Sequence, residues 1–376
     1  MHVCLDVSPA AQKHAGLGRY AAEVARALAE DGAVKLSLFY NREGQAELPA
    51  DLDRLPQRTV NIGNKPWRMA VLLSQLSRRP MDRVFGATEL FHATNHLLAH
   101  FKQARTVFTL HDLIFLHYPE YHMFYNRWYL TLAMPHFLRA ADLIIVPSAC
   151  TKRDAQKFYG LPEDKIKVIY EAAGPHFQPI RQAEAVDRVR RKYGLPERFL
   201  LHVGTIEPRK NLTRLLDAFH ALLGEEPELR LVLVGKKGWL YESFFQRLQA
   251  LGLQERVIFP GFVDEAELPA FYQLAQVFVY PSFYEGFGLP PLEAMSCGAA
   301  VVSSQAASLP EVVGEAGLMV DPADTGALTR ALRRVLLDAE LRRKLQKRSL
   351  EQAQRFSWAK AAQMLVEAYG SVSAQA

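Results

Sequence analysis

The sequence predicts two doubly wound α/β domains, each built on a parallel sheet with helices on both faces. The chain has 376 residues, more than the ~250–300 residues that one hydrophobic core supports. Short apolar runs rich in β-branched residues alternate with segments of helical periodicity, the pattern of a parallel sheet that is buried on both faces. This series occurs twice, and the polar, proline-containing stretch 172–184 separates the two occurrences. We therefore expect domains over 1–178 and 179–357.

Each expected strand is a short apolar run, and a helical segment separates it from the next. In the first half the strands are expected at 2–7, 34–40, 90–94, 106–112, 143–148 and 166–170. The helices expected there cover 17–31, 124–140 and 149–159. In the second half the expected strands are 199–204, 229–235, 256–262, 276–282, 300–304 and 317–322. Ligands bind outside the carboxyl ends of such strands, so residues that follow a strand are the candidates for function.

The composition is typical of a globular protein in a reducing compartment. Hydrophobic residues make up 49% of the chain and charged residues 23%, and no apolar run approaches the ~20 residues of a membrane span. The first residues lead directly into a strand-like run without the pattern of a signal peptide, and the three cysteines show no C-x-x-C spacing. We expect a cytoplasmic protein. The net charge of +5 favours phosphates or an acidic membrane face as partners, and it is too diffuse to predict nucleic-acid binding.

The stretch "HVGTIEPRKN" (202–211) contains a candidate anion site. It ends a strand at Gly204 and carries Arg209 and Lys210 just before a helix expected at 211–223, with Asn211 as the N-cap. Two cations beside a helix N-terminus attract an anion, because the helix dipole adds to their charge. A solvated turn with surface cations is the alternative, and this stretch alone does not decide between the two.

The stretch "LVLVGKKGWLYE" (231–242) ends the next strand in the same way. Gly235 closes the strand, and Lys236 follows it. A glycine at this point allows a ligand to approach the backbone closely, or it serves only to turn the chain tightly. Both interpretations stay open.

The stretch "FYEGFGLPPLE" (283–293) follows the expected strand 276–282 and leads into an apolar helix. Glu285 precedes the turn, and Glu293 lies early in the helix. The two glycines between them expose backbone N–H groups, which suits an oxygen-rich ligand, and the two prolines fit the first helical turn. A glutamate near a helix start also favours the helix dipole without any ligand. That alternative accounts for Glu293 but not for Glu285.

In the first half, His111 stands at the end of the expected strand 106–112. Its ring can donate a hydrogen bond to a ligand hydroxyl or phosphate, or it can be a packed histidine that a backbone carbonyl satisfies. Other histidines occur nearby in sequence, but none has the spacing of a metal motif, and we expect no metal site.

The segment "GLGRYA" (16–21) has the form of a dinucleotide-binding fingerprint. A long polar loop separates it from its strand, whereas the fingerprint requires a tight turn. We interpret Gly16 and Gly18 as part of a ligand-facing loop that enters a helix. An NAD-dependent oxidoreductase is the less favoured alternative.

Taken together, these stretches resemble a known family. "EGFGLPPLE" is similar to the E-x(7)-E signature of retaining glycosyltransferases of family four, which have the GT-B fold of two Rossmann-like domains facing a central cleft. "HVGTIEPRKN", "LVLVGKKGWLYE", "HDLIFLHYPEY" and "HAGLGRY" resemble segments of its bacterial mannosyltransferase-like branch, so the resemblance covers essentially the whole chain. It implies metal-independent, retaining front-side transfer of a hexose, mannose from GDP-mannose, to a glycan or lipid-linked oligosaccharide. No cofactor is implied, since the nucleotide sugar is a substrate.

The resemblance also implies roles for individual residues. Lys210 and Arg209 would neutralise the leaving diphosphate. Glu285 would bind hydroxyls of the transferred sugar, and His111 would contact that sugar from the acceptor side. The implied donor-binding residues are Gly16, Gly204, Thr205, Gly235, Lys236, Phe262, Val263, Gly286, Phe287, Gly288, Leu289 and Glu293.

Within that set, Gly16 would let the first domain close over the diphosphate, and Glu293 would hold the ribose hydroxyls. Main chain near Phe262 and Val263 would contact the base. Many relatives carry an arginine where this chain has Thr205, so diphosphate stabilisation would depend more heavily on Lys210 and its neighbour. A UDP- or ADP-hexose donor and a non-catalytic sugar-nucleotide sensor stay open as alternatives.

Two further helical segments concern membrane binding and the packing of the two domains. Residues 65–83 form a basic amphipathic segment that either lies on an anionic bilayer or packs on the core with a solvated basic face. A peripheral position at the inner face of the membrane would suit a lipid-linked acceptor. The helix 358–376 is expected to pack back on the first domain, as the resemblance implies, or to end the second domain.

Overall fold

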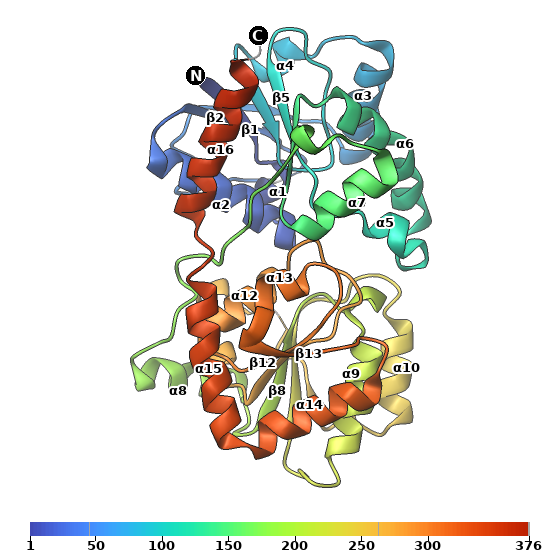
Figure 1. Cartoon of the computed structure of the whole chain (residues 1–376), viewed down its shortest axis with the longest axis vertical. Coiled ribbons are helices and arrows are strands. Elements are labelled where there is room, and N and C mark those ends of the chain that lie inside the picture. The colour runs from blue at the N-terminus through green and yellow to red at the C-terminus, as the bar shows by residue number, and fades with distance from the viewer. Residues whose placement is uncertain (45, 262, 375–376) are drawn as a thin grey trace. The chain divides into compact units, whose positions relative to one another are not determined.

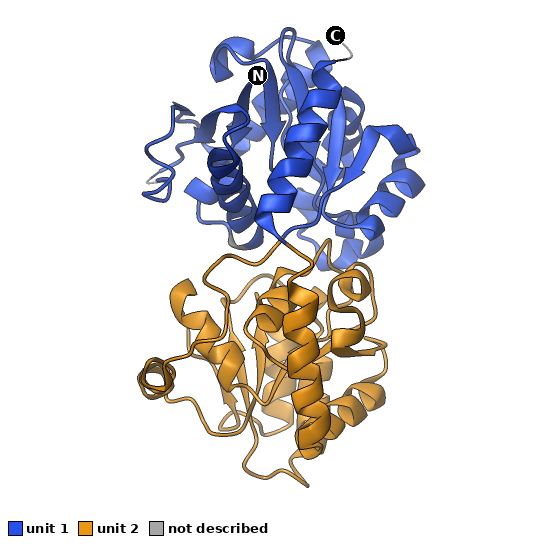
Figure 2. Cartoon of the chain, turned by 60° about the vertical axis from the view of Figure 1, so that its left-hand side comes forward, with its two compact units in different colours: residues 1–171, 357–376 blue, residues 172–356 orange. Residues whose placement is uncertain are grey.

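The computed structural model describes residues 1–44, 46–261 and 263–374. The chain forms two compact units (Figure 2): unit 1 comprises residues 1–171 and 357–376, and unit 2 comprises residues 172–356. The chain thus passes from unit 1 to unit 2 after Glu171 and returns after Phe356. The predicted first division at 178 lies a little later in the chain.

Unit 1 contains a sheet that is parallel throughout its described strands, in the order β3-β2-β1-β4-β5-β6-β7. The strands are β1 (His2–Asp6), β2 (Lys35–Asn41), β3 (Gln57–Val60), β4 (Leu90–Ala93), β5 (Arg105–Thr109), β6 (Leu143–Val146) and β7 (Ile166–Val168). The helices are α1 (Ser8–Ala11), α2 (Ala15–Asp31), α3 (Asn64–Ser77), α4 (Asp82–Phe85), α5 (Ile114–His117), α6 (Phe124–Ala140), α7 (Ala149–Tyr159) and α16 (Trp358–Ser373), with the 3₁₀ turns η1 (Pro119–Tyr121) and η2 (Glu163–Lys165) (Figure 1).

Unit 2 repeats this plan with a parallel sheet in the order β10-β9-β8-β11-β12-β13. Its strands are β8 (Phe199–Val203), β9 (Arg230–Val234), β10 (Val257–Ile258), β11 (Val277–Tyr280), β12 (Val301–Ser304) and β13 (Gly317–Val320). Its helices are α8 (Ala183–Tyr193), α9 (Leu212–Leu222), α10 (Glu242–Ala250), α11 (Leu268–Leu274), α12 (Leu289–Ser296), α13 (Leu309–Val313), α14 (Thr325–Leu337) and α15 (Ala339–Ala353), with η3 (Pro208–Lys210), η4 (Glu265–Glu267) and η5 (Gly314–Ala316). The predicted pair of doubly wound parallel sheets is confirmed.

Both sheets are buried on both faces, because successive side chains of a strand point to opposite sides. In β1, Val3 and Leu5 belong to a core that includes residues of α2 and α16, whereas Cys4 belongs to the core of α3 and α6. In β8, Leu201 packs with α11 and α12, and Leu200 packs with α9 and α14. These apolar strands therefore carry the continuous hydrophobic pattern from which the fold was predicted.

Side chains and glycines at helix ends explain where several helices begin and stop. The Ser148 hydroxyl accepts a hydrogen bond from the Thr151 N–H at the start of α7, and the Asp324 carboxylate does the same for Ala327 at the start of α14. Such N-caps satisfy N–H groups that have no partner within the helix. Gly32 and Gly160 end α2 and α7 in the left-handed conformation, which glycine adopts without strain.

The last helix, α16, belongs to unit 1 and packs on α2. The Tyr369 side chain is fully buried, and its hydroxyl lies 2.7 Å from Nδ1 of His92 in β4. The rings of Tyr20 and Trp358 are also in contact, with centroids 6.1 Å apart. This helix therefore completes one face of the first sheet.

The structure differs from the predicted elements at several places. The segment 65–83 is not one helix: α3 ends at Ser77, because Arg78 adopts the left-handed conformation and Pro80 follows. The strand expected at 256–262 is reduced to β10, and β3 has no apolar run that would predict it. Among the described residues, no helix is both long and apolar enough to cross a bilayer.

Candidate functional site

The carboxyl ends of β8 and β11 form the switch point of the second sheet. The two strands are neighbours, but the chain continues from β8 to β9 on one side and from β11 to β12 on the other. The loops that follow the two strands therefore diverge at this edge, which is the usual ligand position in such sheets. The stretches 204–211 and 281–288 are these two loops.

A buried ion pair joins the two loops. The Lys210 ammonium donates to Oε1 of Glu285 at 2.7 Å and to the Tyr280 hydroxyl at 2.6 Å. Lys210 is 6% exposed and Glu285 is 7% exposed. The sequence placed these two side chains 75 residues apart, and the switch point brings them into direct contact.

Arg209 binds the other side of the same carboxylate. Its guanidinium donates to Oε2 of Glu285 and to the Tyr284 carbonyl, and also to Oε1 of Glu207. Glu207 is buried as well, and sequence reasoning missed it. Two cations and two carboxylates thus form one compact, charge-balanced cluster.

The cluster fixes the charges of its members. Burial by itself would raise the pKa of the Glu285 carboxyl, but Arg209 and Lys210 outweigh it and lower that pKa to about 2. Burial lowers the pKa of Lys210, and the neighbouring Arg209 adds to this, whereas Glu285 acts in the opposite direction. Glu285 is therefore an anion held between cations, which is unsuited to act as a general acid near neutral pH.

Asn211 fixes the chain directly after the two cations. It was predicted as the N-cap of α9 and does occupy that position, but its side chain makes no cap hydrogen bond. Instead its amide donates to the carbonyls of Pro281 and Pro322 at 3.0 and 2.7 Å. Its positive φ of 59° reverses the chain, a conformation that asparagine tolerates better than most residues. Asn211 therefore links the loops after β8, β11 and β13.

Ser308 holds the loop that carries Glu285. Its buried hydroxyl lies 2.8 Å from the Glu285 carbonyl and 2.7 Å from the Phe287 carbonyl. Gly288 has a φ of +116°, and a Cβ there would lie 2.8 Å from Cδ2 of Leu309. The glycine is thus required by the backbone and by close packing. Ser308 carries no motif, and no signal in the sequence could have identified it.

Gly235 lies against the loop that begins at Gly204. A Cβ on Gly235 would lie 2.0 Å from the Gly204 carbonyl oxygen, and the Gly204 N–H donates to Val234 at 2.9 Å. Ile206 also donates to the Lys236 carbonyl at 3.0 Å. The packing of the two loops therefore accounts for Gly235 without a ligand, which is the tight-turn alternative left open above.

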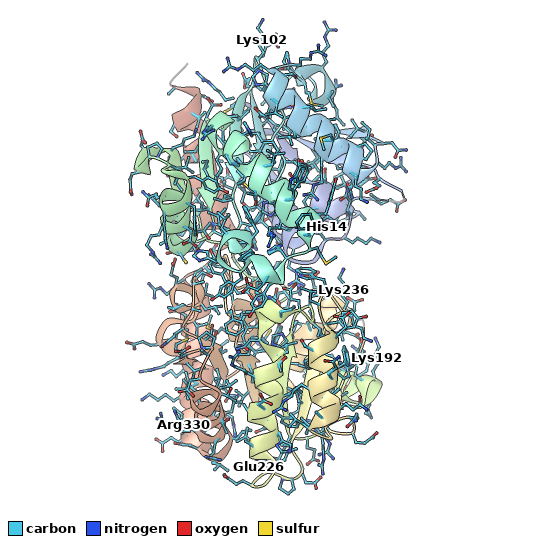
Figure 3. The ribbon with its side chains drawn as sticks, turned by 90° about the vertical axis from the view of Figure 1, so that its right-hand side faces the viewer. His14, Lys102, Lys192, Glu226, Lys236 and Arg330 are labelled. Atoms are coloured by element: carbon cyan, nitrogen blue, oxygen red, sulfur yellow. The ribbon has the colours of Figure 1, made fainter. Side chains whose placement is uncertain are left out.

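Lys236 and Thr205 sit on these two loops. The Lys236 side chain is exposed, at the end of unit 2 that lies opposite Glu226 and Arg330 (Figure 3). Thr205 is partly buried, and its methyl group approaches Gly238 so closely that a Cβ there would lie 2.5 Å away. Both predicted residues thus lie at the carboxyl edge of the second sheet.

Glu293 lies in α12 and is fully buried. Its Oε2 accepts a hydrogen bond from the Tyr272 hydroxyl at 2.8 Å. A ligand hydroxyl would reach this carboxylate only after the groups that cover it move. Glu293 and Glu285 therefore have different environments, although the sequence presents them as a matched pair.

The remaining residues of unit 2 that were predicted to bind the sugar donor could offer mainly backbone groups to it. Phe287 and Leu289 are buried in the core of unit 2, so only their main chain could face a ligand. Gly286 is partly buried beside them, and Val263 is 8% exposed. Phe262 lies outside the described residues.

His202 is a buried residue at this edge that sequence reasoning did not select. Its ring stacks on Tyr280, and its Nδ1 donates to the Val279 carbonyl at 2.9 Å. Burial lowers its pKa to about 4, so the ring is neutral. Its Nε2 is close enough to Gly204 that a Cβ there would lie 3.1 Å from it. The lack of a side chain at Gly204 therefore makes room for this ring.

In unit 1 both predicted glycines lie in α2: Gly18 falls within the helix expected at 17–31, whereas Gly16 is helical and not in the loop to which it was assigned. Gly16 lies in the first turn of α2 and is exposed, and a Cβ there would meet nothing within 4 Å. Gly18 approaches α1 so closely that its Cβ would lie 2.7 Å from the Pro9 carbonyl oxygen. Since α1 separates β1 from these glycines, the tight dinucleotide-binding turn is absent from this described segment, which weighs against the oxidoreductase alternative.

His111 follows β5 and is 7% exposed. Its Nε2 lies 2.8 Å from the Thr94 carbonyl, to which it donates, and its Nδ1 faces Glu171 at 3.8 Å. A backbone carbonyl thus satisfies one ring nitrogen, as the packed alternative predicts, at a position just beyond the carboxyl end of β5. Within the described residues, no group of three or more His, Cys, Asp or Glu side chains is arranged to hold a metal ion.

The fold agrees with comparisons to known proteins. The family description "Glycosyltransferase Family 4" matches residues 14–173, and "Glycosyl transferases group 1" matches residues 186–352. The O-antigen chain mannosyltransferase B of Escherichia coli is 33% identical, and the match covers 98% of this chain and 99% of that protein. This chain belongs to glycosyltransferase family 4.

A second relative and a solved structure are also similar to this family 4 member. The serotype-specific mannosyltransferase WbdA of Escherichia coli is 35% identical over 70% of this chain, but the match spans only 33% of that longer protein. The structure of sucrose-phosphate synthase from Thermosynechococcus elongatus superposes with a TM-score of 0.81 and 23% identity, covering 100% of both chains. The fold is GT-B, and the protein is a glycosyltransferase of the mannosyltransferase-like kind.

Proposed function

We propose that this glycosyltransferase transfers mannose from GDP-mannose, with retention and without a metal ion, to a glycan or lipid-linked oligosaccharide acceptor. The observation that carries the proposal is the cluster of Lys210, Arg209 and Glu285 at the switch point of the second sheet. It offers cations for a diphosphate and a carboxylate for sugar hydroxyls at one edge of the sheet. We place the enzyme in the cytoplasm, where nucleotide sugars are available.

The diphosphate would bind beside Lys210 and Arg209. A lysine ammonium has three N–H donors, and the contacts with Glu285 and Tyr280 use two of them. The third can donate to a phosphate oxygen without breaking the ion pair. Bringing a dianion to this edge also offsets the low pKa of Lys210, because nearby negative charge favours the ammonium form.

The sugar and the nucleoside would bind along the loop after β11. Glu285 would accept hydrogen bonds from sugar hydroxyls, and backbone N–H groups of 286–289 would contact the hexose and phosphate. Glu293 would hold the ribose once its covering groups move, and main chain at 262–263 would contact the base. In unit 1, the exposed first turn of α2 at Gly16 suits a phosphate, since helix N-termini attract anions.

In front-side displacement, the bonds that break and form all belong to the two substrates. The bond between the anomeric carbon and the phosphate oxygen breaks, and a bond to the acceptor oxygen forms on the same face. The acceptor proton passes to the released diphosphate. Lys210 and Arg209 stabilise the charge that develops on that leaving group, which is the main catalytic contribution available here. His111 is proposed to orient the sugar on the acceptor side.

The choice of donor and acceptor is supported by the relatives. The full-length relative is named an O-antigen chain mannosyltransferase, and WbdA is named a mannosyltransferase. Those names favour mannose over glucose and a glycan over a small-molecule acceptor.

Thermal-shift titration with GDP-mannose, UDP-glucose and ADP-glucose tests the donor, and nucleotide release with and without EDTA tests turnover and metal independence. We expect GDP-mannose alone to raise the melting temperature and EDTA to have no effect. An α-linked product by NMR would establish retention. If UDP- or ADP-glucose raised the melting temperature instead, that nucleotide sugar would be the donor in place of GDP-mannose. Binding of GDP-mannose without any release of GDP would identify a sensor.

Glu293→Gln tests the ribose contact. We expect the donor KM to rise about tenfold or more with a small change in kcat, because the lost contact is to a part of the donor that does not react. Glu351→Gln, on the exposed surface of α15, is the control. An unchanged KM for GDP-mannose would show that Glu293 does not contact the donor.

A further inference from the structure

The carboxyl edge of the first sheet holds a buried carboxylate that the proposed transfer does not use. Glu171 follows β7, His111 follows β5 and Thr94 follows β4. These strands are parallel, so the three residues lie at the edge where such sheets bind ligands. Glu171 is 5% exposed, and among the described residues no N–H or O–H group donates a hydrogen bond to its carboxylate. A buried polar group without such a partner is rare, and a ligand that supplies the donor is one explanation for it.

Neighbouring groups fix the ring of His111 that faces this carboxylate. Its Nε2 donates to the Thr94 carbonyl at 2.8 Å. The ring of Tyr20 meets it edge to face with centroids 4.8 Å apart, and the ring of His96 lies nearly perpendicular to it at 5.8 Å. Tyr20 is itself held, since its hydroxyl lies 3.1 Å from Oγ1 of Thr109. The ring of His111 therefore cannot turn without losing the contact to Thr94.

The hydrogen bond at Nε2 determines what the other ring nitrogen can do. A neutral imidazole carries one N–H, and His111 uses it for the Thr94 carbonyl, so its Nδ1 is an acceptor. This Nδ1 lies 3.8 Å from Oε1 of Glu171, which is too long for a direct hydrogen bond. Nδ1 and the carboxylate are thus two neighbouring acceptors, and neither can satisfy the other.

A purely structural ion pair fits these contacts less well. A cation bound to Glu171 would explain its burial, but within the described part of the chain no lysine or arginine forms an ion pair with it. Burial, together with the nearby His111, lowers the pKa of His96 and keeps that ring neutral. A charged His111 would be expected to close on the carboxylate to hydrogen-bond distance, whereas the two groups stay 3.8 Å apart.

We propose that Nδ1 of His111 and the Glu171 carboxylate together bind two adjacent hydroxyls of a sugar ring, each hydroxyl donating to one acceptor. Their separation of 3.8 Å suits neighbouring hydroxyl oxygens of one pyranose. The sugar belongs to the acceptor glycan, because both residues lie in unit 1, whereas the cluster that would hold the donor lies in unit 2. An ammonium group would satisfy the same two acceptors, so the choice of a sugar rests on the proposed function.

Ligand-observed NMR titration with methyl α-mannoside and two analogues tests the pair of hydroxyls. The hydroxyl at carbon 3 takes part in every pair of adjacent free hydroxyls on this ring, so the 3-deoxy analogue retains no such pair, whereas the 6-deoxy analogue retains all of them. We expect the wild-type protein to bind the 3-deoxy analogue about tenfold or more weakly than methyl α-mannoside, and to bind the 6-deoxy analogue as well as the parent. Equal binding of the 3-deoxy analogue and the parent, or no binding of the parent, would overturn the proposal.

Glu171→Met, which keeps the length of the side chain and removes the acceptor, tests the carboxylate. We expect methyl α-mannoside to bind about tenfold or more weakly, because hydrogen bonds to a charged acceptor are the stronger ones. The melting temperature should stay the same or rise, since a buried carboxylate without a donor costs stability. Glu30→Met, at the exposed end of α2, is the control and should leave sugar binding unchanged. A lower melting temperature of Glu171→Met with unchanged sugar affinity would show a structural role and overturn the proposal.

GDP release from GDP-mannose separates this inference from the proposed function. Glu171→Met should leave the KM for GDP-mannose unchanged, because the residue would contact only the acceptor. A raised donor KM with unchanged affinity for methyl α-mannoside would place the two hydroxyls on the transferred hexose and overturn the assignment to the acceptor. Release of GDP by a wild-type protein that does not distinguish the 3-deoxy analogue would refute the inference alone. Sugar binding that depends on Glu171 without any release of GDP would refute the proposed function alone.

Discussion

The ammonium of Lys210 lies 2.7 Å from Oε1 of Glu285, and both side chains are more than nine-tenths buried. Arg209 donates a hydrogen bond to the other carboxylate oxygen of Glu285. The carboxylate is therefore held between two cations before any substrate binds. The donor therefore meets a site whose charges are already in place, and little reorganisation is needed during transfer.

Lys210→Ala should slow transfer by about 10²–10³-fold, the usual effect of removing one donor that stabilises developing charge. It also leaves Glu285 with one fewer cation, and losing a buried partner costs about 3–5 kcal/mol. Turnover from GDP-mannose and circular dichroism measure the two effects. Lys210→Met, which keeps the volume, guards against simple misfolding, and Lys347→Ala, 82% exposed in α15, is the surface control. Near-normal turnover in folded Lys210→Met would contradict the assignment.

Acid should destabilise unit 2 through Glu285. Its pKa is about 2 in the folded protein against a reference of 4.5, so the folded state holds the deprotonated form more strongly. The resulting stability is fully present above about pH 4.5 and is lost as the pH falls toward 2, to a total of about 3 kcal/mol. Urea unfolding between pH 7 and 3 should show a steeper decline for wild type than for Glu285→Gln. Parallel pH profiles would refute this.

Gly235→Ala should destabilise the protein by several kcal/mol. The new Cβ would lie 2.0 Å from the Gly204 carbonyl oxygen, and the φ of +148° is unfavourable for alanine. Because the displaced loop leads to Lys210, kcat should fall as well. Gly224→Ala, whose Cβ would meet nothing within 4 Å, should change neither quantity. Thermal melting and turnover of the two variants compare them directly, and similar melting temperatures would argue against the backbone contact.

The stability that the contact between α16 and the first sheet contributes should also depend on pH. Burial lowers the pKa of His92 to about 3, so this ring is neutral when folded and takes up a proton on unfolding below its reference value of 6.5. Stability is therefore lost as the pH falls from about 6.5 toward 3. Tyr369→Phe removes the 2.7 Å contact to that ring and should cost about 1–3 kcal/mol. Tyr125→Phe, half exposed on α6, should cost nothing measurable in the same melts.

Several strand ends of the second sheet could be predicted from the sequence because an apolar run there stops at a glycine or a proline. Gly204, Gly235 and Pro281 mark three such ends, and the general rule for parallel sheets then selects the residues that follow. Lys210 and Glu285 were found in this way. Their direct contact could not be predicted, because it depends on strand order, which local periodicity does not encode.

Other parts of the site depend on packing between distant segments. Ser308 and Tyr280 carry no motif, and only the folded loops place their hydroxyls against Glu285 or Lys210. The inward orientation of Trp67 and the outward orientation of Phe124 were equally inaccessible, because both residues lie on helices whose two faces are apolar in part. The glycines at 16 and 18 were assigned to a loop that enters a helix because a long polar stretch separates them from their strand, and that stretch itself contains the short helix α1.

Because α16 follows unit 2 in the sequence yet covers the first sheet, unit 1 is completed only after unit 2 has been synthesised. Unit 2 is continuous in sequence and can close as soon as Phe356 has left the ribosome. Unit 1 is begun first and finished last, and until α16 arrives the apolar faces of α2 and β4 lack their cover. A nascent chain that stalls late would therefore expose the older half of the protein to chaperones and proteases.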